Sequence, residues 1–133
     1  MTDTVPAKKI LLIDDDTFLL DMYSLKFSKA GYEVKTADST DLGLKLLRDG
    51  YSPDVILADI VMPGMDGLEL VGNIRKEKLA PTAALIMLTN QGASDDVARA
   101  RKMNVDGYIV KATTIPSEVL AEVEKVTSSK KPQ

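Results

Sequence analysis

The chain has 133 residues, 44% hydrophobic and 28% charged, which suits one globular domain with a buried core. It contains neither cysteine nor histidine, which excludes disulfides, thiol chemistry, serine–histidine catalysis and a phosphohistidine carrier, and argues against the common zinc sites. The net charge of -3 comes without a basic stripe, so no direct nucleic-acid partner is expected.

The predicted elements alternate between short apolar strands and helices along the whole chain. In chain order they are strand 8–13, helix 17–30, strand 33–37, helix 40–47, strand 54–59, helix 66–76, strand 83–88, helix 94–103, strand 106–110 and helix 116–126. Such alternation predicts an α/β protein with a parallel sheet and right-handed crossovers. We expect a single doubly wound, five-stranded, flavodoxin-like sheet in the order 2-1-3-4-5 with five helices.

The two ends of the chain are polar. Residues 1–7 are predicted to form an N-terminal tail and residues 127–133 a C-terminal tail, leaving one domain over residues 8–126. No segment resembles a signal sequence or reaches the length of a membrane span, so we expect a cytoplasmic protein without membrane contacts. Because only short tails flank the domain, we expect a stand-alone module with no DNA-binding effector.

The most informative stretch is the apolar run that begins after Pro53 and stops on a single carboxylate, Asp59. The Met62-Pro63-Gly64 segment that follows cannot continue a strand. Burying an unpaired carboxylate at the end of such a strand is costly, which makes Asp59 the strongest candidate for the chemical centre.

Polar residues also end the other strands. Asp14 and Asp15 follow the first strand, Thr89 the fourth and Lys111 the fifth. Parallel strands end at the same edge of a sheet, so we expect these residues to converge near Asp59. Three clustered carboxylates repel each other, and a hard divalent cation, Mg²⁺ or alternatively Mn²⁺, would relieve this repulsion. The cation and Lys111 together would neutralise the carboxylates and allow a phosphoryl group to bind.

These motifs resemble the receiver domains of two-component response regulators, closest to the single-domain chemotaxis type. Ile13-Asp14-Asp15-Asp16 is similar to the family's acidic pair. Asp59 with Met62-Pro63-Gly64-Met65-Asp66-Gly67 is similar to the phosphoacceptor and its M-P-x-M-D-G segment. Leu88-Thr89 matches the switch threonine, and Tyr108-Ile109-Val110-Lys111 the switch aromatic residue and the lysine.

The resemblance implies that Asp59 takes a phosphoryl group from a sensor histidine kinase or a histidine phosphotransfer protein. Asp15, Asp59 and the backbone carbonyl of Val61 would bind Mg²⁺ directly, and Asp14 would bind it directly or through water. No other cofactor is implied, and the activity would be limited to self-catalysed phosphotransfer and dephosphorylation, so the protein would not be an enzyme.

The resemblance further implies a conformational switch. Thr89 would move to bond the acyl phosphate, Lys111 would pair with it, and Tyr108 would turn inward. The switched face, formed by helix 94–103, strand 106–110 and helix 116–126, would signal to a downstream protein. The chain would be a monomer, or a dimer once phosphorylated.

Two positions depart from the family pattern. Ala112 follows Lys111, where the family usually has proline. Val61 is apolar at a position that, in the family, lies near the hydrolytic water, so the resemblance implies a long-lived phosphoryl state. We expect Val61→Asn, or Gln91→Glu, to change the dephosphorylation rate.

Each motif alone has a simpler interpretation. The acids at positions 14–16 could cap a helix, Lys111 could be a solvated loop lysine, Thr89 a turn residue, and Tyr108 a packing residue. Three rival functions also stay open. They are a Mg²⁺-dependent aspartyl-phosphate hydrolase of the haloacid dehalogenase kind, a receiver-like scaffold that is not phosphorylated, and a flavodoxin-like cofactor binder, which the missing phosphate loop disfavours.

Overall fold

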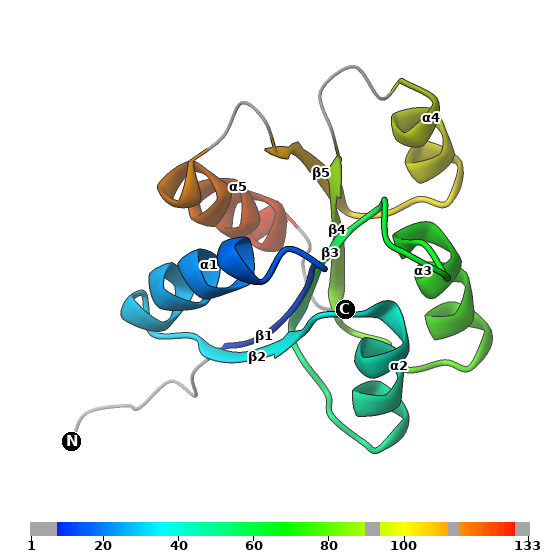
Figure 1. The fold of residues 1–133 in the computed structure, drawn as a ribbon, viewed down its shortest axis with the longest axis horizontal. Coiled ribbons are helices and arrows are strands. Elements are labelled where there is room, and N and C mark those ends of the chain that lie inside the picture. The colour runs from blue at the N-terminus through cyan, green and yellow to red at the C-terminus, as the bar shows by residue number, and fades with distance from the viewer. Residues whose placement is uncertain (1–7, 90–93, 112–114, 130–133) are drawn as a thin grey trace.

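The computed structural model describes residues 8–89, 94–111 and 115–129. Its elements are β1 (Lys9–Ile13), α1 (Thr17–Lys29), β2 (Glu33–Ala37), α2 (Thr40–Arg48), β3 (Val55–Asp59), α3 (Gly67–Lys76), β4 (Ala84–Thr89), α4 (Ser94–Lys102), β5 (Gly107–Val110) and α5 (Pro116–Ser129). The strands form one parallel sheet in the order β2-β1-β3-β4-β5 (Figure 1). The predicted doubly wound, flavodoxin-like fold is thus confirmed.

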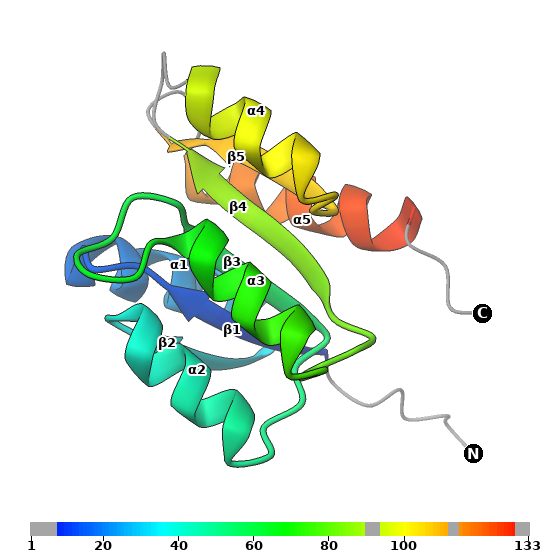
Figure 2. The same cartoon turned by 90° about the vertical axis from the view of Figure 1, so that its right-hand side faces the viewer.

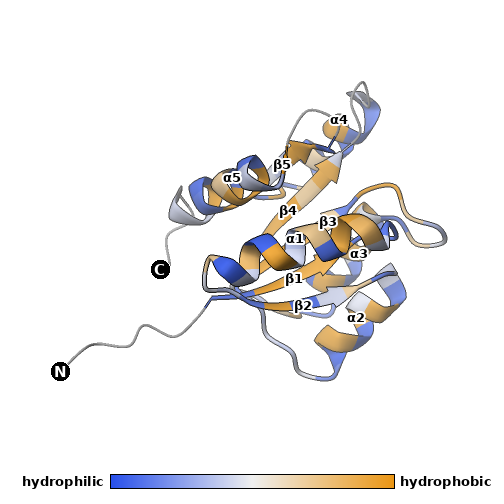
Figure 3. Cartoon of the chain, turned by 60° about the vertical axis from the view of Figure 1, so that its left-hand side comes forward, coloured by the Kyte–Doolittle hydropathy of each residue, from blue (hydrophilic) through white to orange (hydrophobic). Residues whose placement is uncertain are grey.

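The helices cover both faces of the sheet. Helices α1 and α5 lie on one face, and α2, α3 and α4 lie on the other, where Figure 2 shows them in front of the strands. Each face carries its own apolar cluster: Ile56 and Met87 point toward α2 and α3, whereas Leu57 and Leu88 point toward α1 and α5. Figure 3 shows the apolar strands between helices whose outer surfaces are more polar. Burial on both faces explains why the central strands are continuous apolar runs.

The helices begin where the sequence supplies a capping side chain. Asp16 caps α1 by accepting from the Leu19 amide at 3.2 Å, and Ser39 caps α2 by accepting from the Leu42 amide at 3.1 Å. The hydroxyl of the next residue, Thr40, donates to the Met65 carbonyl at 2.7 Å. That bond ties α2 to the loop after β3.

The last helix is longer than the pattern of apolar residues predicts. It continues through Ser129, past the predicted domain end at Val126. The Thr127 hydroxyl donates to the carbonyls of Val123 and Glu124, at 3.0 and 3.1 Å, so this polar residue is accommodated within the helix. The tail predicted from residue 127 is thus helical in its first three residues, and the tails over 1–7 and 130–133 lie outside the described residues.

The register of the sheet separates the side chains near its carboxyl edge onto two faces. Met87 pairs with Tyr108, Leu88 with Ile109, and Thr89 with Val110. Because side chains alternate along a strand, Thr89 and Tyr108 share the face of Met87. Among the described helices, none is long and apolar enough to cross a membrane.

Candidate functional site

The carboxyl edge of the sheet brings together residues that are far apart in the sequence. Asp14 follows β1, Asp59 ends β3, Thr89 ends β4 and Lys111 follows β5. Ile13 pairs with Ala58, which places Asp14 directly beside Asp59. Asp14, Asp59 and Thr89 are buried, with at most 4% of their surface exposed. The predicted convergence of the strand ends is therefore present.

Lys111 connects the two buried carboxylates. Its Nζ lies 3.0 Å from Asp14 Oδ2 and 3.1 Å from Asp59 Oδ2, and its side chain is 15% exposed. Breaking such a partly buried pair would leave an uncompensated charge. Lys111 is accordingly a partner of both acids rather than a solvated loop lysine.

Backbone amides fix the other oxygen of each carboxylate. The Val61 amide donates to Asp59 Oδ1 at 3.2 Å, and the Asp16 amide donates to Asp14 Oδ1 at 2.9 Å. Each acid thus accepts one bond from its own loop and one from Lys111. These bonds hold both side chains in a single orientation at the sheet edge.

Three carboxylates at this edge can share a cation. Asp14, Asp15 and Asp59 each offer an oxygen, and these oxygens lie within 4.8 Å of one another. Asp15 is exposed, unlike the other two, so the group opens to solvent on its side. Oxygen-only donors with room for water suit Mg²⁺, so the residues present fit the implied ion. The part assigned to the Val61 carbonyl stays a prediction.

Burial and pairing act in opposite directions on the charged groups. Burial raises the pKa of Asp59 above its ordinary value, while the bonds from Lys111 and the Val61 amide oppose that rise. For Lys111, burial lowers the pKa, but the bonds to Asp14 and Asp59 outweigh it and leave the pKa raised. The ammonium therefore stays charged, and a cation beside Asp59 would favour its ionised form.

In the part of the chain that the structure describes, no hydrogen bond joins the side chain of either predicted switch residue to the acids. The Thr89 hydroxyl is fully buried, and its Oγ1 lies 3.5 Å from the Ile109 carbonyl, a long distance for a hydrogen bond. Tyr108 points outward, with 36% of its surface exposed. Its hydroxyl accepts bonds from Arg101 on α4, at 3.0 Å from Nε and 2.7 Å from Nη2. Tyr108 is thus held on the outer side of the sheet.

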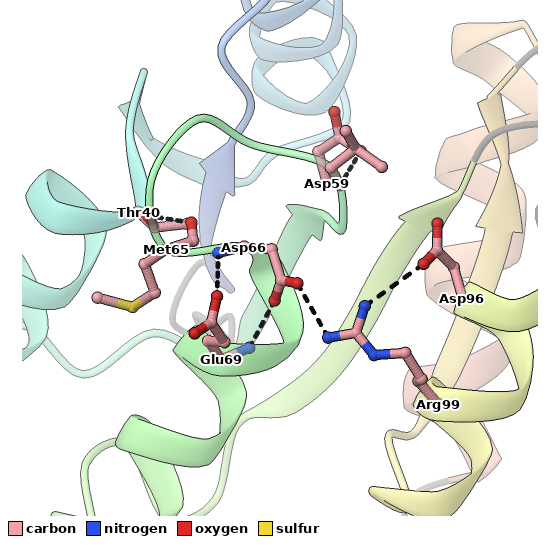
Figure 4. Close-up of polar contacts among 8 residues, drawn as sticks. Thr40, Asp59, Met65, Asp66, Glu69, Asp96 and Arg99 are labelled. Carbon is pink, nitrogen blue, oxygen red and sulfur yellow. Dashed lines mark hydrogen bonds and ion pairs between the residues drawn. The ribbon is translucent and has the colours of Figure 1, made fainter.

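The loop after Asp59 is fastened where it joins α3. Asp66 caps α3 by accepting from the Glu69 amide at 2.8 Å, and Glu69 returns the bond to the Asp66 amide at 3.0 Å (Figure 4). The second oxygen of Asp66 binds Arg99 of α4 at 2.9 Å. At Gly67, an added Cβ would collide with the Asp59 carbonyl, so the start of α3 requires glycine there.

The arginine contacts of α4 were not predicted from the sequence. Arg99 and Arg101 lie on a polar helix, and that pattern is typical of a solvated face. Their partners, Asp66 and Tyr108, are identified only by the packing of α4 beside α3 and β5. Gln91 and Ala112, for which the sequence suggested roles, lie outside the described residues.

Comparison with known proteins agrees with this geometry. A family model described as response regulator receiver domain matches residues 10–124. The phosphate regulon transcriptional regulatory protein PhoB of Pseudomonas aeruginosa is 32% identical over 120 residues, covering 90% of this chain and 52% of that protein. The transcriptional regulatory protein AfsQ1 of Streptomyces coelicolor is 37% identical over 102 residues, covering 77% and 44%. The chain thus spans about half the length of these relatives.

Solved structures match over nearly their whole length. A CheY-like receiver domain protein from Methanospirillum hungatei JF-1 superposes with a TM-score of 0.83 at 28% identity, covering 94% of this chain and 97% of that chain. The chemotaxis response regulator CheY4 of Vibrio cholerae gives a TM-score of 0.82 at 28% identity, covering 91% and 99%. The sequence, the fold and the acidic edge therefore agree on one family.

Proposed function

We propose, because this chain belongs to the response regulator receiver domain family of two-component signalling, that Asp59 accepts a phosphoryl group from the phosphohistidine of a sensor histidine kinase or a histidine phosphotransfer protein. The observation that supports this most is the pairing of Asp59 with Lys111, at 3.1 Å, inside a group of three carboxylates. The pairing makes the nucleophile and its counter-ion neighbours before any substrate binds.

In the proposed transfer, one oxygen of Asp59 attacks phosphorus and forms a new O–P bond. The N–P bond of the donor breaks, and the imidazole leaves with that electron pair and takes up a proton. Lys111, which now bonds Asp59, pairs with an oxygen of the incoming phosphoryl group. The same residues would serve dephosphorylation, in which water attacks phosphorus, the bond from phosphorus to Asp59 breaks, and inorganic phosphate leaves the restored carboxylate.

We assign the binding of Mg²⁺ to Asp14, Asp15 and Asp59, together with the Val61 carbonyl. When bound, the ion neutralises charge on the carboxylates and on the phosphoryl oxygens. Mn²⁺ would suit the same oxygen donors. The side chain of Val61 is 52% exposed in the loop that follows Asp59, so we expect Val61→Asn to change the dephosphorylation rate. An unchanged rate would remove the predicted role of this position.

The proposed output is a change in the face formed by α4, β5 and α5. Thr89 would bond the acyl phosphate, Tyr108 would turn inward, and a downstream protein would recognise the altered face. Phosphorylation could also pair two copies through this face. Stand-alone action, without an attached output domain, stays a prediction, because the curated relatives are about twice as long as this chain.

The hydrolase alternative requires the residues that follow β1 to supply both the nucleophile and the acid. It would use Asp14 as nucleophile and Asp16 as acid. Asp16 instead caps α1, where its side chain accepts a hydrogen bond from the Leu19 amide. This contact favours the receiver interpretation, in which Asp59 reacts.

The test is incubation with acetyl phosphate and Mg²⁺, followed by intact mass measurement. We expect one phosphoryl group on the wild type and none on Asp59→Asn, while Asp21→Asn, a change at an exposed aspartate of α1, retains it. Mass gain that survives in Asp59→Asn would refute the proposal. Absence of mass gain in a folded wild type would favour the non-phosphorylated scaffold.

A further inference from the structure

Helix α4 is attached to the rest of the domain in an unusual way. Ala100 is its one buried residue, whereas α3, of similar length, buries Gly67, Leu68, Leu70, Val71 and Ile74. Burial of apolar side chains normally supplies most of the stability of a helix in a protein. Polar contacts must therefore have a larger share in holding α4 in place.

Two arginine contacts fasten α4 to α3. Arg75 of α3 donates to the carbonyls of Met103 and Asn104, just beyond the end of α4, the latter at 2.9 Å. Arg99 of α4 binds Asp66, the cap of α3. Both contacts join α4 to α3 alone, so neither responds directly to a movement of the Tyr108 side chain.

The contact of Arg101 differs from these two, because it joins α4 to Tyr108 of β5. Two of its guanidinium nitrogens donate to the Tyr108 hydroxyl at 3.0 and 2.7 Å, and its Cζ lies 5.7 Å from the centre of the tyrosine ring. Charge-assisted hydrogen bonds and a cation over an aromatic ring both stabilise this arrangement. Every one of these contacts requires Tyr108 to point outward.

The inward path of Tyr108 leads away from Arg101. Thr89 and Tyr108 project from the same face of neighbouring strands, and Thr89 lies two residues beyond Met87, the partner of Tyr108 in the sheet. If the Tyr108 side chain turns toward Thr89, its hydroxyl moves away from the outward position in which it accepts from Arg101. The bonds to Arg101 are then lost, so the inward and outward positions compete.

We propose that Arg101 is a positioning residue that holds Tyr108 outward and thereby opposes phosphorylation of Asp59. This inference rests on the proposed function, in which the acyl phosphate favours the inward tyrosine. A contact that exists in only one of two states changes the free-energy difference between those states by the free energy of the contact. By reciprocity, whatever stabilises the outward state weakens binding of the phosphoryl group by the same factor.

The test measures binding of beryllofluoride, a mimic of the acyl phosphate, in the presence of Mg²⁺. We expect Arg101→Ala to tighten binding about fivefold, equivalent to about 1 kcal/mol at 25 °C. Lys102→Ala is the matched control, because it removes the same charge from the next position of α4, where the side chain is also exposed. It should leave the affinity unchanged, and Arg101→Lys, which keeps the charge but lacks the planar fork, should fall between.

A double-mutant cycle separates this mechanism from a general loosening of α4. In a Tyr108→Phe background, which lacks the accepting hydroxyl, Arg101→Ala should tighten binding much less than in the wild type. Equal effects in both backgrounds, or an effect of Lys102→Ala as large as that of Arg101→Ala, would overturn the inference.

Phosphorylation of Asp59 by acetyl phosphate, measured by intact mass on each variant, tests the proposed function separately. If the wild type is phosphorylated and Arg101→Ala binds beryllofluoride no tighter, the inference alone fails.

Discussion

Helices α3 and α4 are neighbours of similar length, yet different interactions hold them. Helix α3 buries an apolar face, closes a capping box and begins against the backbone of Asp59. Helix α4 buries Ala100 and is otherwise held by contacts that include Arg75, Arg99 and Arg101. Apolar burial is insensitive to small changes of charge, whereas exposed ionic contacts are weak and easily exchanged. The comparison identifies α3 as the fixed support of the site and α4 as the element that can move.

The largest effect is expected at the junction of α3 with the site. In Gly67→Ala the new Cβ would meet the Asp59 carbonyl, which must shift, so we expect a loss of about 3 kcal/mol in the free energy of unfolding. Gly72→Ala on the same helix is the control: its Cβ would lie 3.7 Å from Met103 Cε, an ordinary contact. Since alanine favours the helix interior, it should stabilise by about 0.5–1 kcal/mol in urea unfolding. Equal stabilities for the two variants would contradict this account of α3.

A valine on each helix compares the two directly. Val71 is 2% exposed on α3, and its replacement by alanine should cost about 2 kcal/mol through lost burial and a residual cavity. Val97 on α4 is only partly buried, and Val97→Ala should cost less than about 1 kcal/mol. Urea midpoints for both variants measure the difference. Similar losses would mean that α4 depends on apolar burial as much as α3 does.

The ion pair between the helices predicts a dependence on pH. Partial burial raises the pKa of Asp66, but the bonds from the Glu69 amide and Arg99 outweigh it and hold the pKa below its ordinary value of 3.8. A lowered pKa in the folded state adds stability above that ordinary value, and this stability is lost as the pH falls through the folded pKa. Asp66→Asn keeps a capping side chain and removes the charge, so it should cost about 0.5 kcal/mol near neutral pH. Urea midpoints against pH should show this gap closing in acid; a gap that persists there would exclude the ionic origin.

The smallest effect is expected from salt. Raising NaCl from about 0.05 to about 0.5 M screens the exposed pair of Arg99 and Asp66, so amide exchange in α4 should accelerate about twofold. Exchange in α3 should change little, because Leu70 and Ile74 remain buried. Hydrogen exchange at both salt concentrations provides the comparison. Equal acceleration in the two helices would remove the distinction between them.

The features that could be predicted from the sequence are those with local signals. The buried strands appear as continuous apolar runs, Asp59 stands out where one of them stops, and the alternation of strands and helices predicts a parallel sheet. Asp66 and Ser39, residue types that favour capping, lie immediately before helices and cap them. The contact of Arg101 with Tyr108 has no such signal, because surface side chains choose partners according to how whole elements pack. The end of α5 was also misplaced, since nothing apolar marks Thr127 as helical.

Neighbouring residues at the end of β5 have different partners. Ile109 packs on the side of α1 and α5, and Lys111, just past the strand, binds the acids, whereas Tyr108 lies on the side of α4. The lysine that binds the acids and the proposed switch tyrosine thus come from one short stretch of chain but contact different partners. A substitution that changes the contact of Tyr108 with α4 can consequently leave the contacts of Lys111 with the acids unchanged, so the two sets of contacts can diverge independently during evolution.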